Sequence, residues 1–437
     1  MSNELPKDGK PGQSLDARFA TRPEVRQRLL EIADMMDQAI ENGATADEAE
    51  AMAIEQIRQL GTAVLADWAR AKQAHSLAQV QKENPKAIRH IKKKVKWSTT
   101  YGLIAVEEQL LRVGRRGSEL RPFCIKAGVQ HRGYSRRLQR VLVDFGAESA
   151  FGPAAQRVRE HYGIDLPISR VRLATLKHAR AMAVVAQKIQ ARPSAKTLLT
   201  GIDGSMVPIV QPGSGADKRK GKKLLWREAR LCCARSTDTV QALYGATLGS
   251  VEVASWTWQQ TVRLAGCTPS THVHGVGDGA VWILNTFEQN FGQQGTYTID
   301  FFHVSEYLAA AAPHVARPGK ETLWRRRQQA RLLENRRAAV LRALEKALED
   351  EGAEETPVRS AHQYISQRRD SMDYAGARAK HLPIGSGEIE SGHRHVIQHR
   401  LKISGGWWTE KNMESMLQLR TARANGWWDI YWHNAKN

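Results

Sequence analysis

Hydrophobic residues near the start of the chain recur every three to four positions, and the first such run contains Val25, Leu29, Ile32 and Met36. A second run covers 46–65 after a break at Gly43. This period is that of amphipathic helices. Thr45, with Glu48 three residues later, has the pattern of a capping box at the start of the second helix. The sequence therefore predicts a helical hairpin over residues 17–77.

The helical period stops before a basic run at residues 88–97, IRHIKKKVKW. Beyond this run, Tyr101, Leu103 and Ala105 alternate with their neighbours as in a short strand. A run of lysine and arginine is usual on a solvated face, and it also suits a segment that follows a phosphate backbone. Both interpretations of the basic run stay open.

Residues 151–182 have the pattern of a helix, a glycine turn and a second, basic helix. The first helix ends at Tyr162 and Gly163, and Ser169 is placed to cap the second one. This is the arrangement of a helix-turn-helix, whose second helix lies in the DNA major groove. Two helices that only pack together have the same pattern. The candidate DNA-binding residues are Arg170, Arg172 and Lys177.

The hydrophobic period changes to two residues after a linker at 191–194. The alternation predicts strands at 198–203, 224–234, 240–248, 272–277 and 296–302, with a short extended piece at 206–210. The helical period predicts helices at 251–264 and 280–291, and a charged helical stretch at 304–369. Three strands, helix, strand, helix, strand is the element order of a ribonuclease-H-like α/β fold.

We therefore predict an α/β protein with a ribonuclease-H-like catalytic core that carries a helical insertion. An α-helical DNA-binding region with the helix-turn-helix precedes this core. The polar segment 1–13 has the composition of a disordered segment. The expected divisions are an N-terminal helical region at 1–95, a DNA-binding region at 96–192, a catalytic core at 193–303 and 371–437, and an insertion at 304–370.

The charge of the chain narrows the class of partner. Lys+Arg number 65 against 45 Asp+Glu, which gives a net charge of +20 that is spread along the chain. Such a charge favours a polyanion, and nucleic acid rather than a membrane surface, because each phosphate contact releases counterions. With the helix-turn-helix pattern, the expected partner is double-stranded DNA. No apolar run is long enough to span a membrane, and the first residues lack the apolar core of a signal peptide. We expect a cytoplasmic, nucleoid-associated protein with no membrane partner.

For the cysteines and the tryptophans, a structural role is favoured over a chemical one. The four cysteines, at 124, 232, 233 and 267, form no C-x-x-C pair, so neither a zinc ribbon nor a disulfide framework is indicated. Five tryptophans lie near the C-terminus, at 407, 408, 427, 428 and 432. They can stack on unpaired bases, but burial against the catalytic core is favoured.

Acidic residues stand at the ends of the predicted strands. Asp203 ends the strand in LLTGIDGS, and Asp278 ends the strand in HVHGVGDGAVWI. Each of them also suits an ordinary turn or helix cap. Asp300 and His303, in TIDFFHVSEYL, add a carboxylate and an imidazole at a third strand end. Their common placement at the ends of one predicted sheet favours a shared site.

A third carboxylate is expected from the stretch IGSGEIESGH at 384–393. On a helix, Glu388 and Glu390 point about 200° apart, so both cannot face one site. Glu390 shares a face with His393 and Ile397, which turns toward a core, whereas Glu388 is expected to face outward. We choose Glu390 as the site residue, and Glu388 stays the alternative.

Carboxylates within basic surroundings suit phosphodiester chemistry. Mg²⁺ and Mn²⁺ are hard cations that take oxygen ligands. Two such ions, about 3.5 to 4 Å apart, activate an attacking oxygen and stabilise a leaving oxygen. We expect Asp203, Asp278 and Glu390 to hold two ions while lysine and arginine side chains hold the rest of the strand.

Five ordered blocks, "TGIDGS", "GDGAVWI", "IDFFHVSEYL", "PIGSGEIESGHRHVIQHRLK" and "WDIYW", resemble the DDE transposases of bacterial insertion sequences of the Kra type, relatives of the Mutator-like superfamily. The resemblance covers about residues 95–433 and implies a ribonuclease-H-like core, a helical insertion before the glutamate, and Mg²⁺-dependent DNA cleavage and strand transfer. The aspartates of the family's triad correspond to Asp203 and Asp278, and its glutamate corresponds to Glu390. A D-x-x-H block corresponds to Asp300 and His303, with a supporting role near the site.

Three functions agree with these patterns. A DDE transposase cuts and joins DNA at element ends, a ribonuclease-H-like nuclease or resolvase cuts without joining, and a non-catalytic sequence-specific DNA-binding protein does neither. The three acids argue against the last function, and only the family resemblance separates the first two. Because a transposase acts on two element ends, we also expect a homo-oligomer on DNA.

Overall fold

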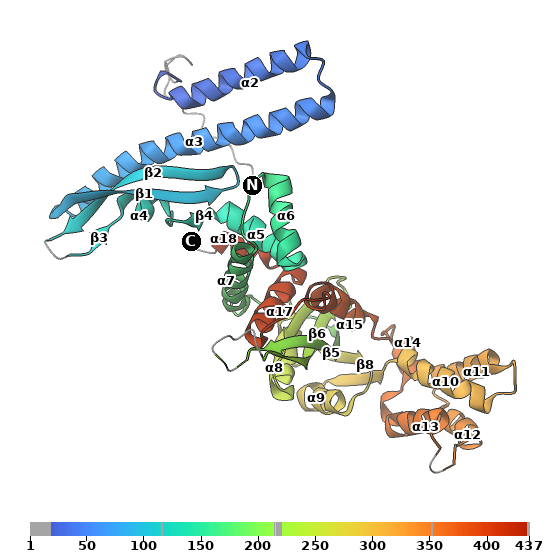
Figure 1. Ribbon diagram of the computed structural model, residues 1–437. Coiled ribbons are helices and arrows are strands. Elements are labelled where there is room, and N and C mark those ends of the chain that lie inside the picture. The colour runs from blue at the N-terminus through green and yellow to red at the C-terminus, as the bar shows by residue number, and fades with distance from the viewer. Residues whose placement is uncertain (1–18, 115–116, 214, 216–220, 351–352, 435–437) are drawn as a thin grey trace. The chain divides into compact units, whose positions relative to one another are not determined.

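The structure is a computed structural model that describes residues 19–114, 117–213, 215, 221–350 and 353–434 (Figure 1). The segment 1–13, which the sequence predicts to be disordered, lies outside the described residues. Contacts divide the chain into two compact units, which are taken in turn below. The first unit contains the residues up to 146 together with 151–174, and the second contains 147–150 and 175–434.

The first unit begins with the predicted helical hairpin, which is confirmed as α2 (Pro23–Glu41) and α3 (Ala46–Glu83). The capping box is also confirmed. The Thr45 hydroxyl accepts the backbone N–H of Glu48, and the Glu48 carboxylate accepts the backbone N–H of Thr45 at 2.8 Å. These bonds satisfy two of the N–H groups that an α-helix leaves without partners at its start.

A four-stranded sheet in the order β3-β2-β1-β4 follows the hairpin. Its strands are β1 (Ala87–Thr99), β2 (Gly102–Val113), β3 (Glu119–Leu120) and β4 (Gly133–Tyr134), with α4 (Pro122–Ala127) between the last two. Side chains of α3, β1, β2 and α4 share one core, which includes Ala69, Val95, Trp97, Ile104 and Phe123.

The sequence analysis misplaced this sheet in two ways. The strand alternation was assigned to Tyr101, Leu103 and Ala105, but the buried residues in this first part of β2 are Ile104 and Val106, and Leu103 is exposed. A shift of one residue exchanges the two faces of a strand. The division expected between 95 and 96 falls inside β1, whose side chains pack with those of α3.

Three helices complete the first unit: α5 (Arg136–Glu148), α6 (Phe151–Tyr162) and the start of α7 (Ile168–Ala186). They share a core of Leu138, Leu142, Ala154, Val158 and Val171. Gly163 has a φ of +64°, the left-handed conformation that commonly ends a helix. The predicted sequence of helix, glycine turn and helix is therefore present. The cap expected at Ser169 is wrong, because α7 begins at Ile168.

The second unit contains a five-stranded sheet in the order β7-β6-β5-β8-β9. Its strands are β5 (Thr197–Gln211), β6 (Lys223–Ser236), β7 (Leu243–Thr247), β8 (His272–Gly277) and β9 (Gly295–Ile299). The first three are antiparallel neighbours, and β8 and β9 run parallel to β5. The predicted α/β class is confirmed. The strand expected at 296–302 ends earlier, at Ile299, because the next residues begin a helix.

Helices cover both faces of this sheet (Figure 1). On one face α8 (Val251–Leu264) and α9 (Val281–Phe291) form a core with the sheet that includes Ile202, Trp258 and Phe287. On the other face lie α15 (Gly387–Gly392) and α17 (Glu410–Ala424). A Cβ atom at Gly201 would lie 3.6 Å from the Cβ of Ile389, so α15 approaches β5 closely.

The central strand β5 does not end at Asp203. Asp203 is paired with Leu231 on β6, and the pairing continues to Gln211 and Lys223. The Asp-Gly turn considered for this position is therefore wrong. The Glu228 side chain packs over Gly204, where a Cβ atom would lie 2.0 Å from its carboxylate oxygen. We call the extension at 204–211 and 223–229 the two-stranded arm.

The predicted helical stretch after β9 is present and has its own core. It contains α10 (Phe301–Val315), α11 (Glu321–Leu333), α12 (Arg337–Glu345), α13 (Pro357–Gln367), a 3₁₀ turn (Arg369–Ser371) and α14 (Tyr374–Ala379). Leu308, Leu332, Val340, Ile365 and Tyr374 are buried together there. The helices thus extend past both ends of the insertion expected at 304–370.

The C-terminal part continues from α15 through a π-helix (His393–Gln398), α16 (His399–Leu401), α17 and α18 (Trp428–Asn434). Trp408 and Trp432 are buried, as favoured above, whereas Trp407 is exposed. All four cysteines are free thiols. Within the described residues, none of the helices has the length and apolar character needed to cross a membrane.

Candidate functional site

One aspartate lies on the central strand of the five-stranded sheet, and a second directly follows the neighbouring strand. Asp203 is on the central strand β5, and Asp278 directly follows β8, the next strand. Burial raises the pKa of Asp203 to about 6; the N–H of Gly204 opposes this shift, and nearby carboxylates, including Asp278 and Glu390, add to it. The influence of these carboxylates means that the three predicted acids lie in one electrostatic neighbourhood.

Glu390 lies on α15, which packs against β5 and β6. The Glu390 side chain is exposed, and its Oε1 accepts the hydroxyl of Ser386 at 3.0 Å. Within the described ranges, no lysine or arginine forms an ion pair with Asp203, Asp278 or Glu390. In the same part of the chain, no group of three or more His, Cys, Asp or Glu side chains has an arrangement that could hold a metal ion.

Glu388 has a different partner. Its Oε1 accepts Arg235 Nε at 2.7 Å, and the ion pair is half-buried against β6. The expectation that Glu388 faces outward is therefore wrong. The faces were assigned from residues such as His393 and Ile397, which lie in a π-helix, where α-helical spacing no longer gives the facing residues.

Asp300 is buried, with 3% of its surface exposed, at the start of α10. One carboxylate oxygen accepts the backbone N–H of Phe302 at 2.6 Å and that of His303 at 3.3 Å. The other accepts the backbone N–H of Ser386 at 2.8 Å and also the Ser386 hydroxyl. Asp300 therefore ties the loop before α15, which carries Glu390, to the start of α10.

His303 is not part of this tether. Its Nδ1 lies 3.3 Å from an oxygen of Glu306, and its ring contacts Tyr307 and Tyr364 edge to face. No described contact links the His303 side chain to Asp203, Asp278 or Glu390. The D-x-x-H pair thus divides into a buried tether and a half-exposed histidine on the first turns of α10.

The sequence analysis did not select His393, which lies beside Asp203. It is buried, with 4% of its surface exposed, and its Nε2 lies 3.5 Å from Oδ2 of Asp203. Neither ring nitrogen has a hydrogen-bond partner among the described residues. Burial lowers the pKa of His393 to about 4, so the imidazole is neutral near pH 7. Its spacing from Glu390 was the sequence signal that could have identified it.

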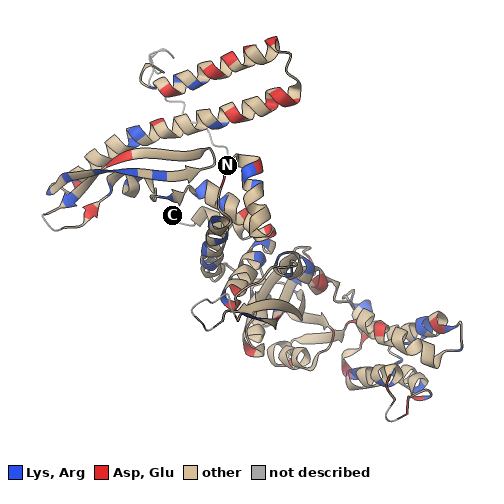
Figure 2. Cartoon of the chain, in the orientation of Figure 1, with Lys and Arg blue, Asp and Glu red and all other residues tan. Residues whose placement is uncertain are grey.

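The candidate DNA-binding side chains on α7, Arg170, Arg172 and Lys177, are all exposed. Strand β1 is a second basic surface, with exposed Lys92, Lys93, Lys94 and Lys96. In Figure 2 lysine and arginine follow β1, whereas acidic residues are prominent along α2 and α3. The hairpin of α2 and α3 is therefore a poor candidate for phosphate contacts.

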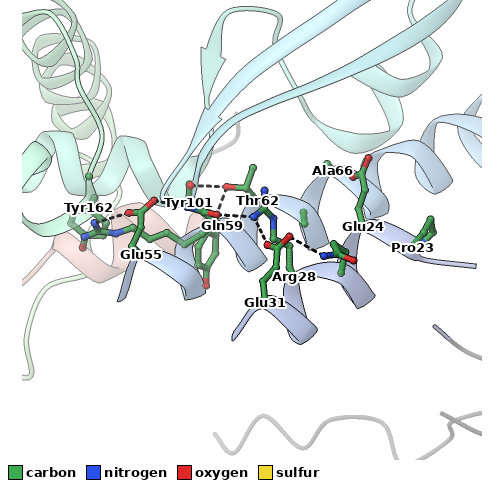
Figure 3. A pocket seen from close by; sticks show the side chains of 14 residues that line it. Pro23, Glu24, Arg28, Glu31, Glu55, Gln59, Thr62, Ala66, Tyr101 and Tyr162 are labelled. Atoms are coloured by element: carbon green, nitrogen blue, oxygen red, sulfur yellow. Dashed lines mark hydrogen bonds and ion pairs between the residues drawn. The ribbon is translucent and has the colours of Figure 1, made fainter. Parts of the chain in front are cut away.

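A hollow of about 670 Å³ lies in the first unit between α2 and α3 (Figure 3). Its polar side chains are paired with one another. Arg28 donates to Glu31 at 2.5 Å and to Gln59 at 2.9 Å, and the Thr62 hydroxyl donates to the carbonyl of Tyr101 at 2.7 Å. These contacts join α2 to α3 and α3 to the turn between β1 and β2, and we assign no ligand to the hollow.

The exposed arginines of α7 give a direct test of DNA binding. Arg170→Ala and Arg172→Ala are each expected to weaken binding to element-end DNA. Loss of a base contact costs roughly 1 to 3 kcal/mol and relaxes sequence choice, whereas loss of a phosphate contact weakens binding to all DNA alike. Competition binding with end and random DNA measures both effects. Arg326→Ala, a charge-matched change on α11, is the control, and unchanged affinities in both α7 variants would leave α7 with a packing role only.

Comparisons with known proteins cover part of the chain. The profile of the uncharacterised protein family UPF0236 matches residues 267–435. The "UPF0236 protein in vanSb 3′ region" of Streptococcus gallolyticus is 28% identical over 161 residues. That match covers 36% of this chain and 34% of the relative, so the chain matches about a third of the relative's length.

A structural comparison found the Drosophila P element transposase strand transfer complex, with a TM-score of 0.26 and 7% identity over 71% of this chain and 83% of that one. At this TM-score the likeness supports no argument about fold or function. The proposals below therefore rest on the residues of this chain and on its sequence resemblance.

Proposed function

We propose that the protein is a DDE transposase that cleaves DNA at the ends of an insertion sequence and joins those ends to a target. The observation that carries this proposal is the placement of Asp203 on the central strand β5, of Asp278 directly after the neighbouring strand β8, and of Glu390 on α15, which packs against β5 and β6. The charges of Asp278, Glu228 and Glu390 add to the burial that raises the pKa of Asp203. Such clustering of like charges is unfavourable by itself, and it is typical of sites that work with cations.

The sheet supports a ribonuclease-H-like core. Its order is β7-β6-β5-β8-β9, with the first three strands antiparallel and the last two parallel to β5. Asp203 lies on the central strand, Asp278 follows the adjacent strand, and Glu390 is on a helix that packs against β5 and β6. The helices α10 to α14 come between the second aspartate and the glutamate, which agrees with the resemblance to the Kra-type transposases.

The three carboxylates have the donor chemistry that Mg²⁺ or Mn²⁺ requires, although among the described residues they are not arranged as a three-residue metal-binding group in this structure. The donors are carboxylate oxygens, which hard cations prefer, and no described lysine or arginine neutralises them. Asp203, Asp278 and Glu390 would hold the ions. When bound, two such ions supply activation of the attacking oxygen and stabilisation of the leaving oxygen.

The remaining groups position these carboxylates and the DNA. In cleavage, a water oxygen forms a bond to phosphorus and the bond to the 3′ oxygen breaks, which leaves a 3′ hydroxyl. In joining, that hydroxyl forms the new bond to a target phosphorus and a target 3′ oxygen leaves. Asp300 and Ser386 hold the loop before Glu390, neutral His393 lies beside Asp203, and exposed Lys and Arg side chains bind the phosphates.

An assay with DNA that carries both flanking element ends, a target plasmid and Mg²⁺ tests this function. Cleavage and joined product are expected with Mg²⁺ and neither with EDTA. Cleavage without any joined product would favour the nuclease or resolvase alternative. Binding with no cleavage under any divalent cation would favour the non-catalytic DNA-binding protein.

The proposed function also predicts assembly on DNA. One set of three carboxylates holds one pair of ions, and two ends must be cut and joined together, so at least two chains are needed. Two-fold symmetry is the commonest arrangement. Light scattering with paired end DNA is expected to give a dimer or a larger assembly. A monomeric complex that joins both ends would contradict this prediction.

A further inference from the structure

One half of the helical hairpin contains no buried side chain. The buried residues of α3 are Ala69, Ser76 and Val80, and all of them lie in the second half of this helix. In α2 the buried residue is Val25, close to the start of the helix. None of the residues 26–57, all of which the structure describes, is buried. We call residues 29–57, which surround the turn between the two helices, the hairpin tip.

The hairpin tip nevertheless has apolar side chains at helical spacing. A hollow of about 520 Å³ lies between α2 and α3 at this end, and it shares no lining residue with the hollow of Figure 3. We call it the tip groove. Residues four positions apart lie on one face of a helix. Two such rows line the tip groove: Ile32, Met36 and Ile40 on α2, and Ala49, Ala53 and Ile57 on α3.

The apolar side chains of the tip groove are open to solvent. The exposed fractions are 57% for Met36, 77% for Ile40 and 52% for Ile57. Helices in proteins gain most of their stability when an apolar face packs against another element. Contiguous apolar surface that stays exposed is typical of a site where another protein binds. The tip groove therefore has the character of a docking surface.

The charge of the hairpin tip is opposite to that of the whole chain. Residues 29–57 contain eight carboxylates and no lysine, arginine or histidine, in a chain with a net charge of +20. Two of these carboxylates pair with arginines of the same hairpin, and a third takes part in the cap of α3. Glu50 lines the tip groove. The carboxylates that are exposed and form no ion pair with a described residue are Asp34, Asp37, Glu41, Asp47 and Glu50.

These charges distinguish between the possible occupants of the tip groove. A second hairpin tip would add its own eight carboxylates, and DNA would add phosphates, so both are repelled. Residues 1–18 contain three acidic and three basic side chains, and therefore have no excess of positive charge. A cationic helix with one apolar face complements both the apolar rows and the carboxylates around them, and such helices commonly bind in apolar grooves.

We infer that the tip groove binds a cationic amphipathic helix of a partner protein. The apolar side chains of that helix fill the space between the two rows, and its lysine or arginine side chains face Glu50 and the other unpaired carboxylates. The inference does not depend on the proposed function, since it uses no residue of the carboxylate site and no contact with DNA.

Binding of designed peptides to the full chain, without DNA, tests the inference. Each labelled peptide has about 18 residues, which is five helical turns. The first is an amphipathic helix of leucine and lysine, the second has the same composition with leucines distributed around the helix, and the third is an amphipathic helix of leucine and glutamate. In fluorescence anisotropy the first is expected to bind at least about tenfold more tightly than the others, because it alone combines an apolar face with positive charge.

Glutamine variants locate the binding site, since glutamine removes the apolar side chain and keeps a good helix propensity. Met36→Gln and Ile57→Gln are each expected to weaken binding of the first peptide by about 5- to 30-fold, as for central residues of an interface. Glu50→Gln is expected to reduce the salt dependence of binding. Leu30→Gln is the matched control on α2, because Leu30 is 51% exposed and does not line the tip groove. Circular dichroism verifies that each variant keeps its helix content.

The inference is overturned if the wild-type chain binds the three peptides equally or binds none of them. It is also overturned if folded Met36→Gln and Ile57→Gln bind the first peptide as tightly as wild type, or if Leu30→Gln weakens binding as much as they do. Light scattering of the chain without DNA tests a second copy as the occupant. A wild-type dimer that Met36→Gln converts to a monomer would assign the tip groove to self-association and contradict the inference.

Discussion

Asp203→Asn, Asp278→Asn and Glu390→Gln are each expected to abolish DNA cleavage while DNA binding changes little. An amide of the same size keeps the packing but removes the negative charge that a divalent cation requires. Removal of a residue that only supports a metal ligand lowers activity roughly 10- to 100-fold, and the expected loss of cleavage rate in these variants is larger. Phosphate contacts by Lys and Arg side chains elsewhere keep the DNA bound. Gel assays of cleavage and anisotropy assays of binding, on the same preparations, measure the two effects.

Glu388→Gln is the matched control for the third carboxylate. Glu388 is two residues from Glu390 and is paired with Arg235 rather than turned toward Asp203. This variant is expected to cleave DNA at a rate close to that of wild type. An inactive Glu388→Gln beside an active Glu390→Gln would reverse the assignment and make Glu388 the third carboxylate.

Asp300→Ala is expected to lower both stability and cleavage. It removes the cap of α10, which is worth about 1 kcal/mol, and leaves the backbone N–H of Ser386 without its acceptor, which costs about 1 to 3 kcal/mol. The free energy of unfolding should therefore fall by roughly 2 to 4 kcal/mol. Cleavage should fall because the loop that precedes Glu390 loses its tether. Urea denaturation and the cleavage assay measure these changes.

Glu306→Ala provides the comparison on the same helix. Glu306 is exposed and contacts only His303 among the described residues, so its loss should change the unfolding free energy by no more than about 0.5 kcal/mol. If Asp300→Ala were as stable as Glu306→Ala and cleaved DNA normally, Asp300 would not be the tether that its four hydrogen bonds indicate.

The local period of hydrophobic residues was sufficient to predict most helices and strands of the second unit. The strand at 272–277 and the helix at 251–264 have the predicted bounds because each is a short, strongly patterned segment between turn residues. The continuation of β5 through Asp203 could not be predicted in this way. Asp-Gly favours a turn locally, and only pairing with β6, whose partner residues lie some twenty positions away, holds this segment extended.

For the candidate site, too, local sequence patterns could predict only some of the residues. Strand ends pointed to Asp203 and Asp278, and the family resemblance pointed to Glu390, but no local pattern indicated that Arg235 pairs with Glu388 across 153 residues of chain. The role of Asp300 as a tether to Ser386 likewise depends on a contact over 86 residues. The hydrophobic period of a segment does not indicate which of its side chains will contact a distant segment.

The separate core of helices α10 to α14 has a consequence for the order in which the protein is made. A ribosome produces both aspartates first, then the whole helical segment, and only afterwards the loop and helix that bring Glu390 to the sheet. A nascent or prematurely terminated chain that stops within those helices has two of the three carboxylates and no tether partner for Asp300. Under the proposed function, such a fragment can bind chromosomal DNA without cutting it, so the cell is exposed to the nuclease activity only after translation has passed the insertion.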